Sequence, residues 1–282
     1  MTPHYFPAWV PGGTYHVFNR AVALNRLFCS WANVRKFRES LAGRLRPVFA
    51  LYSVSLVGNH FHLHGRVRSL ECIETYVRSL RRPLGRQRRY LAGELSVSAL
   101  VGDAFGRAFQ AYARSFNLSQ RRTGALLDQT VRRLRVRDDL LSRRLCVYHH
   151  ANAMKHGLYD GYRDLGALTS YAETVRGDRG LIDVDAVYAR FGGRAGFVAF
   201  HERSVAYHAR HYRAHDELRH FGYTPYYDKF AGMDGAGSDG VVIAAMDRAG
   251  GKGLAAPGLV DRDYALVRGE PYVWVPEEDD LW

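Results

Sequence analysis

The chain has 282 residues, of which 47% are apolar and 13% aromatic, and its formal net charge is +12 from 40 Lys and Arg against 28 Asp and Glu. This size and apolar content exclude a disordered chain, and the lack of a signal-peptide pattern or a run of about 18 apolar residues predicts a cytoplasmic protein with no membrane partner. Most of the positive charge is arginine, whose forked donors suit phosphate and predict nucleic acid as the partner, although an arginine-favouring genome would give the same bias.

The first predicted elements are a strand and a helix. Residues 14–19 alternate as a strand does, after a turn at Pro11-Gly12-Gly13. Ser30 is expected to cap a helix that Pro47 ends. Its apolar face recurs at three- and four-residue steps and consists of Val34, Phe37, Leu41 and Leu45.

A hairpin and an arginine-rich helix come next. Residues 49–57 and 60–67 predict two strands joined by a turn at Gly58-Asn59. From Ser69 we expect one helix toward Leu91, kinked by Pro83. One side of this helix is apolar, with Ile73, Val77, Leu80 and Leu84. The other side carries Arg78, Arg81, Arg82, Arg86, Arg88 and Arg89.

After a looser stretch to about Thr123, the sequence predicts a further strand and helix. The strand covers residues 130–136, and the helix runs from the N-cap Asp138 to about His156, where Gly157 ends it. The order strand, helix, strand, strand, helix, strand predicts an α+β, ferredoxin-like split βαβ fold with an antiparallel sheet.

The C-terminal part differs in character. We expect a first domain over residues 1–175, a mainly helical extension over 176–231, and a Gly-rich linker with an acidic tail over 232–282. The extension carries His208, His211 and His215 at helical spacing on one face, which could form a second metal site. An exposed helix face is favoured, because Asp216 and Glu217 point off that face and no cysteine is near.

His60 and His62 are the first candidate site residues. On a strand their side chains share one face, while Phe61 turns to the other. Two imidazoles at this spacing can bind one divalent cation, and His64 lies on the same face. The pair alone fits two histidines on a half-exposed strand equally well. A zinc hydrolase would usually add an acidic ligand within four residues, and none follows until Glu71.

Tyr148 and Asn152 are the second candidates. They continue an apolar stripe that begins with Leu141 and Leu145, so we expect them to face the sheet one turn apart. A buried amide needs a partner, which a metal ion or a backbone group would supply. Taken alone, an inward tyrosine is more often a core residue with one satisfied hydroxyl.

Four segments resemble a known family. Gly58-Asn59-His60-Phe61-His62 resembles the HUH motif (His, bulky apolar, His) of single-tyrosine transposases. Residues 148–158 resemble the Tyr-Ile-His-x-Asn-Pro-Val-x-x-Gly-Leu helix of the REP-associated branch, with Ala153-Met154 in place of Pro-Val. Residues 11–20 resemble that family's first strand, and residues 168–171 stand where it has Trp-Ser-Ser-Tyr. The resemblance covers residues 7 to 175, with the segments in the family's order.

The resemblance implies an HUH nuclease domain with Tyr148 as the nucleophile. It implies that His60, His62 and Asn152 bind a divalent metal ion, Mg²⁺ or Mn²⁺. The implied activity is that of a transposase, a DNA endonuclease and strand transferase that cleaves single-stranded, hairpin-flanked DNA through a covalent 5′-phosphotyrosine, as a monomer or homodimer. The arginines expected to contact DNA are Arg78, Arg81, Arg82, Arg132, Arg133 and Arg135. The alternatives are a catalytically silent, domesticated nucleic-acid-binding protein and a His-x-His metal hydrolase that also uses His64.

Overall fold

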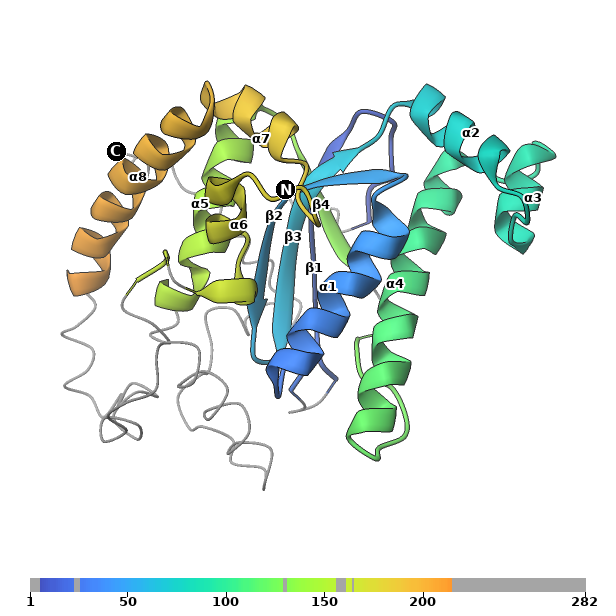
Figure 1. Ribbon diagram of the computed structural model, residues 1–282, viewed down its shortest axis with the longest axis horizontal. Helices are drawn as coiled ribbons and strands as arrows, with labels where there is room; N and C mark the ends of the chain where they lie inside the picture. The colour runs from blue at the N-terminus through green and yellow to red at the C-terminus, as the bar shows by residue number, and fades with distance from the viewer. Residues whose placement is uncertain (1–5, 23–25, 129–130, 156–160, 164, 215–282) are drawn as a thin grey trace.

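The computed structural model describes residues 6–22, 26–128, 131–155, 161–163 and 165–214 (Figure 1). Four strands, β1 (Thr14–Arg20), β2 (Phe49–Val57), β3 (His60–Val67) and β4 (Arg132–Val136), form one antiparallel sheet in the order β2-β3-β1-β4. This order, with helices between β1 and β2 and between β3 and β4, is that of the split βαβ fold. The predicted α+β, ferredoxin-like architecture is confirmed.

Helix α1 (Trp31–Leu45) covers one face of the sheet and follows the prediction closely. Ser30 is its N-cap, because its side chain accepts a hydrogen bond from the backbone N–H of Asn33. The four residues of the predicted apolar face are fully buried: Val34, Phe37, Leu41 and Leu45. The helix packs there against α4 and the sheet.

Helix α4 (Val97–Ser119) corrects the prediction of a looser stretch. It is 23 residues long, begins at the N-cap Ser96 and packs beside α1. Its buried face recurs at helical spacing: Leu100, Val101, Ala104, Phe105, Ala108, Phe109, Tyr112 and Phe116. Gly102 and Gly106 weaken the local preference for helix, but the burial of this long apolar face outweighs their cost of about 1 kcal/mol each.

The single helix predicted from Ser69 to Leu91 is two helices, α2 (Leu70–Ser79) and α3 (Gly85–Leu91). Pro83 lacks the N–H that a continuous helix needs and disfavours helical geometry at the residue before it, so the chain breaks there instead of kinking. Ile73 and Val77 are buried as predicted, but Leu84 is 50% exposed and does not belong to an apolar face.

Helix α5 (Asp139–Lys155) covers the opposite face of the sheet, over β2 and β3. Asp138 is its N-cap as predicted, accepting a hydrogen bond of 2.7 Å from the N–H of Leu141. A 3₁₀ turn, η1 (Gly166–Leu168), and helices α6 (Tyr171–Arg176), α7 (Val184–Phe191) and α8 (Arg194–Ala214) follow. Helices α7 and α8 pack against α5 (Figure 1).

Several predictions lie outside the described residues or stay predictions. The helix stop at Gly157, residue 130 of the predicted strand, and the Gly-rich linker and acidic tail are among the residues that the structure does not describe. The same holds for the side chains of the histidines predicted in the extension. The division of the chain after residue 175 stays a prediction. In the described ranges, no helix is long and apolar enough to cross a membrane.

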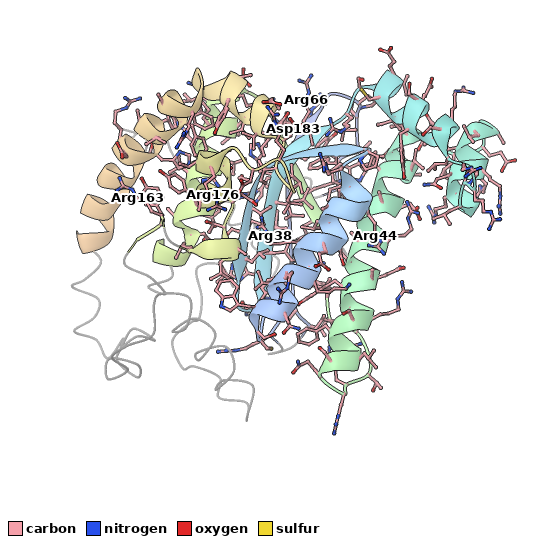
Figure 2. All side chains as sticks on the ribbon, in the orientation of Figure 1. Arg38, Arg44, Arg66, Arg163, Arg176 and Asp183 are labelled. Atoms are coloured by element: carbon pink, nitrogen blue, oxygen red, sulfur yellow. The ribbon has the colours of Figure 1, made fainter. Side chains whose placement is uncertain are left out.

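Some of the arginines form ion pairs with carboxylates of the same chain (Figure 2 labels Arg38 and Arg176). Arg38 of α1 forms an ion pair with Glu173 of α6 and donates to the Ala167 carbonyl at 3.1 Å. Arg176 pairs with Asp178 at 2.8 Å. Such arginines are occupied by carboxylates of the same chain, so the total of 40 Lys and Arg overstates the number of cations available to phosphate.

Candidate functional site

The site lies on the sheet face that α5 covers. His60 and His62 are half-buried on this face, and Phe61 between them is fully buried on the other, as the strand period predicts. In the sheet, His62 lies opposite Phe18 of β1 and Ser55 of β2. The two imidazole centroids are 5.1 Å apart, with their planes at 90°.

A neighbour fixes the tautomer of His60. The Asn59 Oδ1 atom lies 2.9 Å from His60 Nδ1, and because an amide oxygen only accepts, Nδ1 donates and the lone pair is on Nε2. His62 Nδ1 lies 3.0 Å from His16 Nε2, so these two nitrogens share one proton. Burial lowers the pKa of His16 to about 4, which keeps its ring neutral at neutral pH.

Tyr148 and Asn152 of α5 reach the same part of the sheet. The Tyr148 ring centroid lies 5.7 Å from that of His62, edge to face. Asn152 is fully buried, and its Nδ2 donates to Ser55 Oγ at 3.2 Å. Ser55 is the residue of β2 that lies opposite His62 in the sheet. Among the described residues, Asn152 Oδ1 has no hydrogen-bond partner. A buried oxygen of this kind fits a cation ligand.

The face of α5 that meets the sheet differs from the predicted stripe. Ser142, Cys146 and His149 are buried along it, whereas Leu141 and Leu145 are half-buried. The prediction ranked residues by hydrophobicity, but this face packs against polar residues of β2 and β3. Tyr148 therefore lies at the edge of the buried face, half-buried, and not in its middle.

His64 is a structural residue. It is fully buried, with Nε2 3.1 Å from Ser142 Oγ and Nδ1 3.6 Å from Cys146 Sγ. Burial, followed by the charges of His16 and Arg190, holds its pKa well below the ordinary value. Because both nitrogens contact α5, His64 does not join His60 and His62 as the third imidazole that the hydrolase alternative requires.

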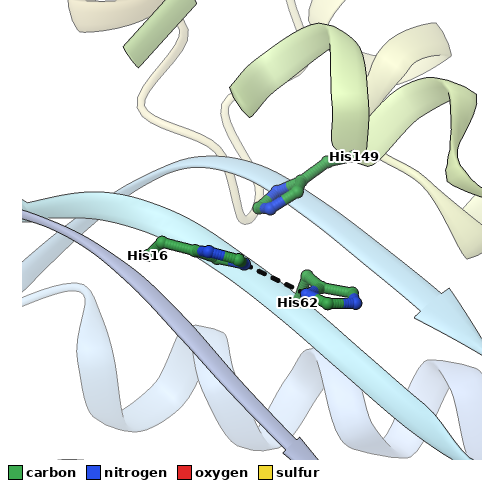
Figure 3. A group of neighbouring side chains, drawn as sticks. All are labelled: His16, His62 and His149. Atoms are coloured by element: carbon green, nitrogen blue, oxygen red, sulfur yellow. Dashed lines mark hydrogen bonds between the residues drawn. The ribbon is translucent and has the colours of Figure 1, made fainter. Parts of the chain in front are cut away.

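Sequence reasoning missed a cluster formed by His16, His62 and His149 (Figure 3). One ligand nitrogen of each ring lies within 4.8 Å of those of the other two. The three come from β1, β3 and α5, and their spacing in the sequence gives no sign that they meet. The strand pairing could have indicated part of the cluster, because His16 and His62 have side chains on the same sheet face in neighbouring strands.

A second histidine network joins α5 to α8. His150 Nδ1 lies 2.8 Å from His201 Nε2, and His150 Nε2 lies 2.7 Å from Ser170 Oγ. His201 Nδ1 donates to the Phe197 carbonyl at 2.8 Å, and the backbone N–H of Val54 donates to Ser170 Oγ at 3.0 Å. All three side chains are fully buried. His150 and Ser170 belong to two different motif segments of the sequence, and the structure places them in contact.

The predicted DNA-binding arginines fall into different groups. Arg78, Arg81 and Arg82 are exposed on the arm formed by α2 and α3, which projects away from α5 (Figure 1). On β4, Arg132 pairs with Asp128 at 3.1 Å. Arg133 donates to the Pro7 carbonyl at 2.7 Å and lies over the Trp9 ring, so it has a structural role. Arg135 is exposed.

No protein-family model and no curated protein matches the chain. A search of solved structures returns the structure of a REP-associated tyrosine transposase bound to a REP hairpin. The match has a TM-score of 0.44 and 13% sequence identity, and it covers 64% of this chain and 89% of that one.

Proposed function

We propose that the protein is a transposase-type DNA endonuclease and strand transferase that cleaves single-stranded, hairpin-flanked DNA through a covalent 5′-phosphotyrosine on Tyr148. The observation that carries the proposal is the position of Tyr148, whose ring is 5.7 Å from that of His62. Asn152, one turn further along α5, is buried with an oxygen that lacks a partner in the described part of the chain. One helix therefore brings a nucleophile and an oxygen ligand to the histidine pair.

His60, His62 and Asn152 would hold a divalent cation, for which Mg²⁺ or Mn²⁺ is our choice because the set includes an amide oxygen. When bound, the cation supplies Lewis-acid polarisation of the scissile phosphate and offsets the charge of the transition state. Asn59 supports this role, since its side-chain oxygen orients the lone pair on His60 Nε2.

Tyr148 attacks phosphorus in the proposed reaction. A bond forms between its phenolic oxygen and phosphorus, the bond from phosphorus to the 3′ oxygen breaks, and the leaving 3′ oxygen takes a proton. A second 3′-hydroxyl reverses these changes and joins strands without ATP. His149 and His150 follow Tyr148 in α5 and are the two candidates, by proximity, for the base that takes the phenol proton. His150 has both ring nitrogens in hydrogen bonds. Burial, followed by the neighbouring histidines His16, His64 and His150, holds the pKa of His149 well below the ordinary value, so it is a weak base.

The arm would bind DNA at a distance from the cut. It begins after Val67, and Val67 is separated from His60 by the length of β3, about 23 Å at 3.3 Å per residue. That distance corresponds to about seven base pairs of duplex at 3.4 Å each. Arg78, Arg81 and Arg82 are therefore proposed to contact phosphates of a hairpin stem while the single strand occupies the site.

The test uses a pool of single-stranded oligonucleotides in which a hairpin is flanked by randomised segments and the 3′ end is labelled. The wild-type protein with Mg²⁺ or Mn²⁺ is expected to give a covalent adduct that survives denaturing electrophoresis. Tyr148→Phe should give none, whereas the matched change Tyr76→Phe on the arm should give the wild-type yield.

Three results would contradict the proposal in different ways. An adduct that persists in Tyr148→Phe would mean that another residue attacks. Hairpin binding without an adduct in any divalent metal would indicate a silent nucleic-acid-binding protein. Turnover of a small phosphodiester that survives Tyr148→Phe would indicate a metal hydrolase.

A further inference from the structure

We propose that His16, His62 and His149 form a second cation site, selective for Zn²⁺ and related transition metals, and that a cation bound there inhibits DNA cleavage by withholding His62. The inhibitory part rests on the proposed function, whereas the site itself does not. The three residues are called the three-histidine cluster below.

One edge of the three-histidine cluster already has the length found in a zinc site, and the ligand nitrogens of all three rings lie within 4.8 Å of one another. The ring centroids are 5.2 Å apart for His16 and His62, 5.1 Å for His16 and His149, and 5.7 Å for His62 and His149. His16 Nε2 and His62 Nδ1 are 3.0 Å apart. Two nitrogens of a tetrahedral complex with zinc bonds of 2.0–2.1 Å are about 3.3 Å apart, so this edge needs little adjustment. Figure 3 shows the His149 ring facing the other two from α5.

His149 is the member that indicates a ligand. It is fully buried, and its Nδ1 lies 2.9 Å from Ser53 Oγ, which holds the ring in place. Its Nε2 has no hydrogen-bond partner among the described residues. The helix motif that residues 148–158 resemble has Ile at this position, so His149 adds an imidazole to this chain at the point where α5 meets the histidines of the sheet.

The donor set determines which cation would bind. Three imidazole nitrogens without a carboxylate suit Zn²⁺ and its neighbours, whereas Mg²⁺ prefers oxygen ligands. The two sites share His62, and a neutral imidazole offers a single lone pair. His62 can therefore serve the three-histidine cluster or the pair with His60, but not both at once.

Metal binding locates the site without any DNA assay. Full-length protein titrated with Co²⁺ should show the visible absorption of a tetrahedral nitrogen-ligated ion at one equivalent. His149→Ile should lower the Co²⁺ affinity at least about 100-fold, because losing a ligand exceeds the roughly 10–100-fold effect of losing a supporting partner. Ser53→Ala, which removes only the hydrogen bond to His149, should lower it by about 10–100-fold. The control His60→Ala should bind Co²⁺ as the wild type does.

The opposite pattern would overturn the site. Loss of Co²⁺ binding in His60→Ala but not in His149→Ile would place the ion at the His60–His62 pair, and a wild-type protein that binds no Co²⁺ would have no such site. If His149→Ile fails to fold, the anomalous signal of wild-type crystals grown with Zn²⁺ decides between a peak among the three rings and a peak beside His60.

Inhibition is measured as adduct yield with excess Mg²⁺, each protein being compared with its own zinc-free yield. Zinc should reduce the adduct yield of the wild type at least tenfold and the yields of Ser53→Ala and His149→Ile by less. Equal inhibition of the three proteins would refute the regulatory role. If the wild type forms no adduct while Co²⁺ binding follows the expected pattern, the proposed function fails and the metal site stands.

Discussion

Replacing His201 with Phe tests the network that fastens α8 to α5. Phe keeps an aromatic ring among Phe197, Tyr171 and Phe191, whose centroids lie 4.1, 5.2 and 5.9 Å from that of His201. It removes the acceptor of the His150 N–H and the donor to the Phe197 carbonyl. Because a buried donor without a partner costs about 1–3 kcal/mol, we expect the variant to be less stable by that amount at pH 7.5.

The same variant should respond differently to acid. Burial lowers the pKa of His201 from 6.5 in the unfolded chain to about 4 in the folded one. The unfolded chain therefore takes up a proton as the pH falls below about 6.5, whereas the folded chain resists until about 4. The stability that neutral His201 contributes is fully present above pH 6.5 and is lost as the pH falls toward 4. Between pH 7.5 and 5 this loss is about 2 kcal/mol in the wild type and absent in His201→Phe.

Urea unfolding followed by circular dichroism at pH 7.5 and pH 5 measures both effects. The difference in the free energy of unfolding between wild type and His201→Phe should decrease by about 2 kcal/mol from pH 7.5 to pH 5. Phe191→Leu changes the same cluster without removing a titrating group, so its difference from wild type in the free energy of unfolding should be the same at both pH values. If the difference between His201→Phe and wild type were also equal at both pH values, the pKa of His201 would not contribute to the pH dependence of stability.

Two further predictions concern the sheet and the arm. Gly65→Ala should lower the free energy of unfolding by about 1–3 kcal/mol in thermal or urea unfolding, because its Cβ would lie 2.2 Å from the Ala50 carbonyl oxygen. Gly43→Ala in α1 should raise it by about 0.4–1 kcal/mol, because outside the helix's own backbone no described atom lies within 4 Å of the new Cβ. Equal effects of the two substitutions would contradict the packing. Arg81→Ala should weaken hairpin binding and reduce the slope of log affinity against log salt by about 1. Arg133→Ala should mainly lower the unfolding midpoint, because Arg133 donates to the Pro7 carbonyl. If instead Arg133→Ala reduced the salt slope and Arg81→Ala did not, the arm would not contact phosphate.

The sheet and its two flanking helices were predictable because local patterns and burial agree there. The hairpin of β2 and β3 and the cap of α1 have the bounds that their turn and capping residues predict. Helix α4 was missed although its apolar residues recur at helical spacing; its two interior glycines weaken the local preference for helix, and packing beside α1 outweighs them. Pro83 was identified as a local disturbance, but the chain leaves the helix at Leu80 and begins a new one at Gly85, so the disturbance is a break and not a kink.

For the histidine pair and its neighbours, too, the sequence predicts part of the arrangement and tertiary packing determines the rest. That His60 and His62 share one face follows from the strand period. That Tyr148 and Asn152 meet them depends on where α5 crosses the sheet, which no local pattern determines. The contacts of His16 with His62 and of His150 with His201 join residues 46 and 51 positions apart. Such pairings are set by strand register and helix docking, so sequence spacing alone does not identify them.

The His150–His201–Ser170 network ends in two backbone groups, the Phe197 carbonyl and the Val54 N–H. A carbonyl can only accept and an N–H can only donate, so every hydrogen bond between them must run in one direction. Proton conduction along a chain of hydrogen bonds requires the direction to reverse, and fixed ends prevent this. The network therefore holds His150 and His201 in fixed tautomers and fastens α5 to α8 without conducting protons between them.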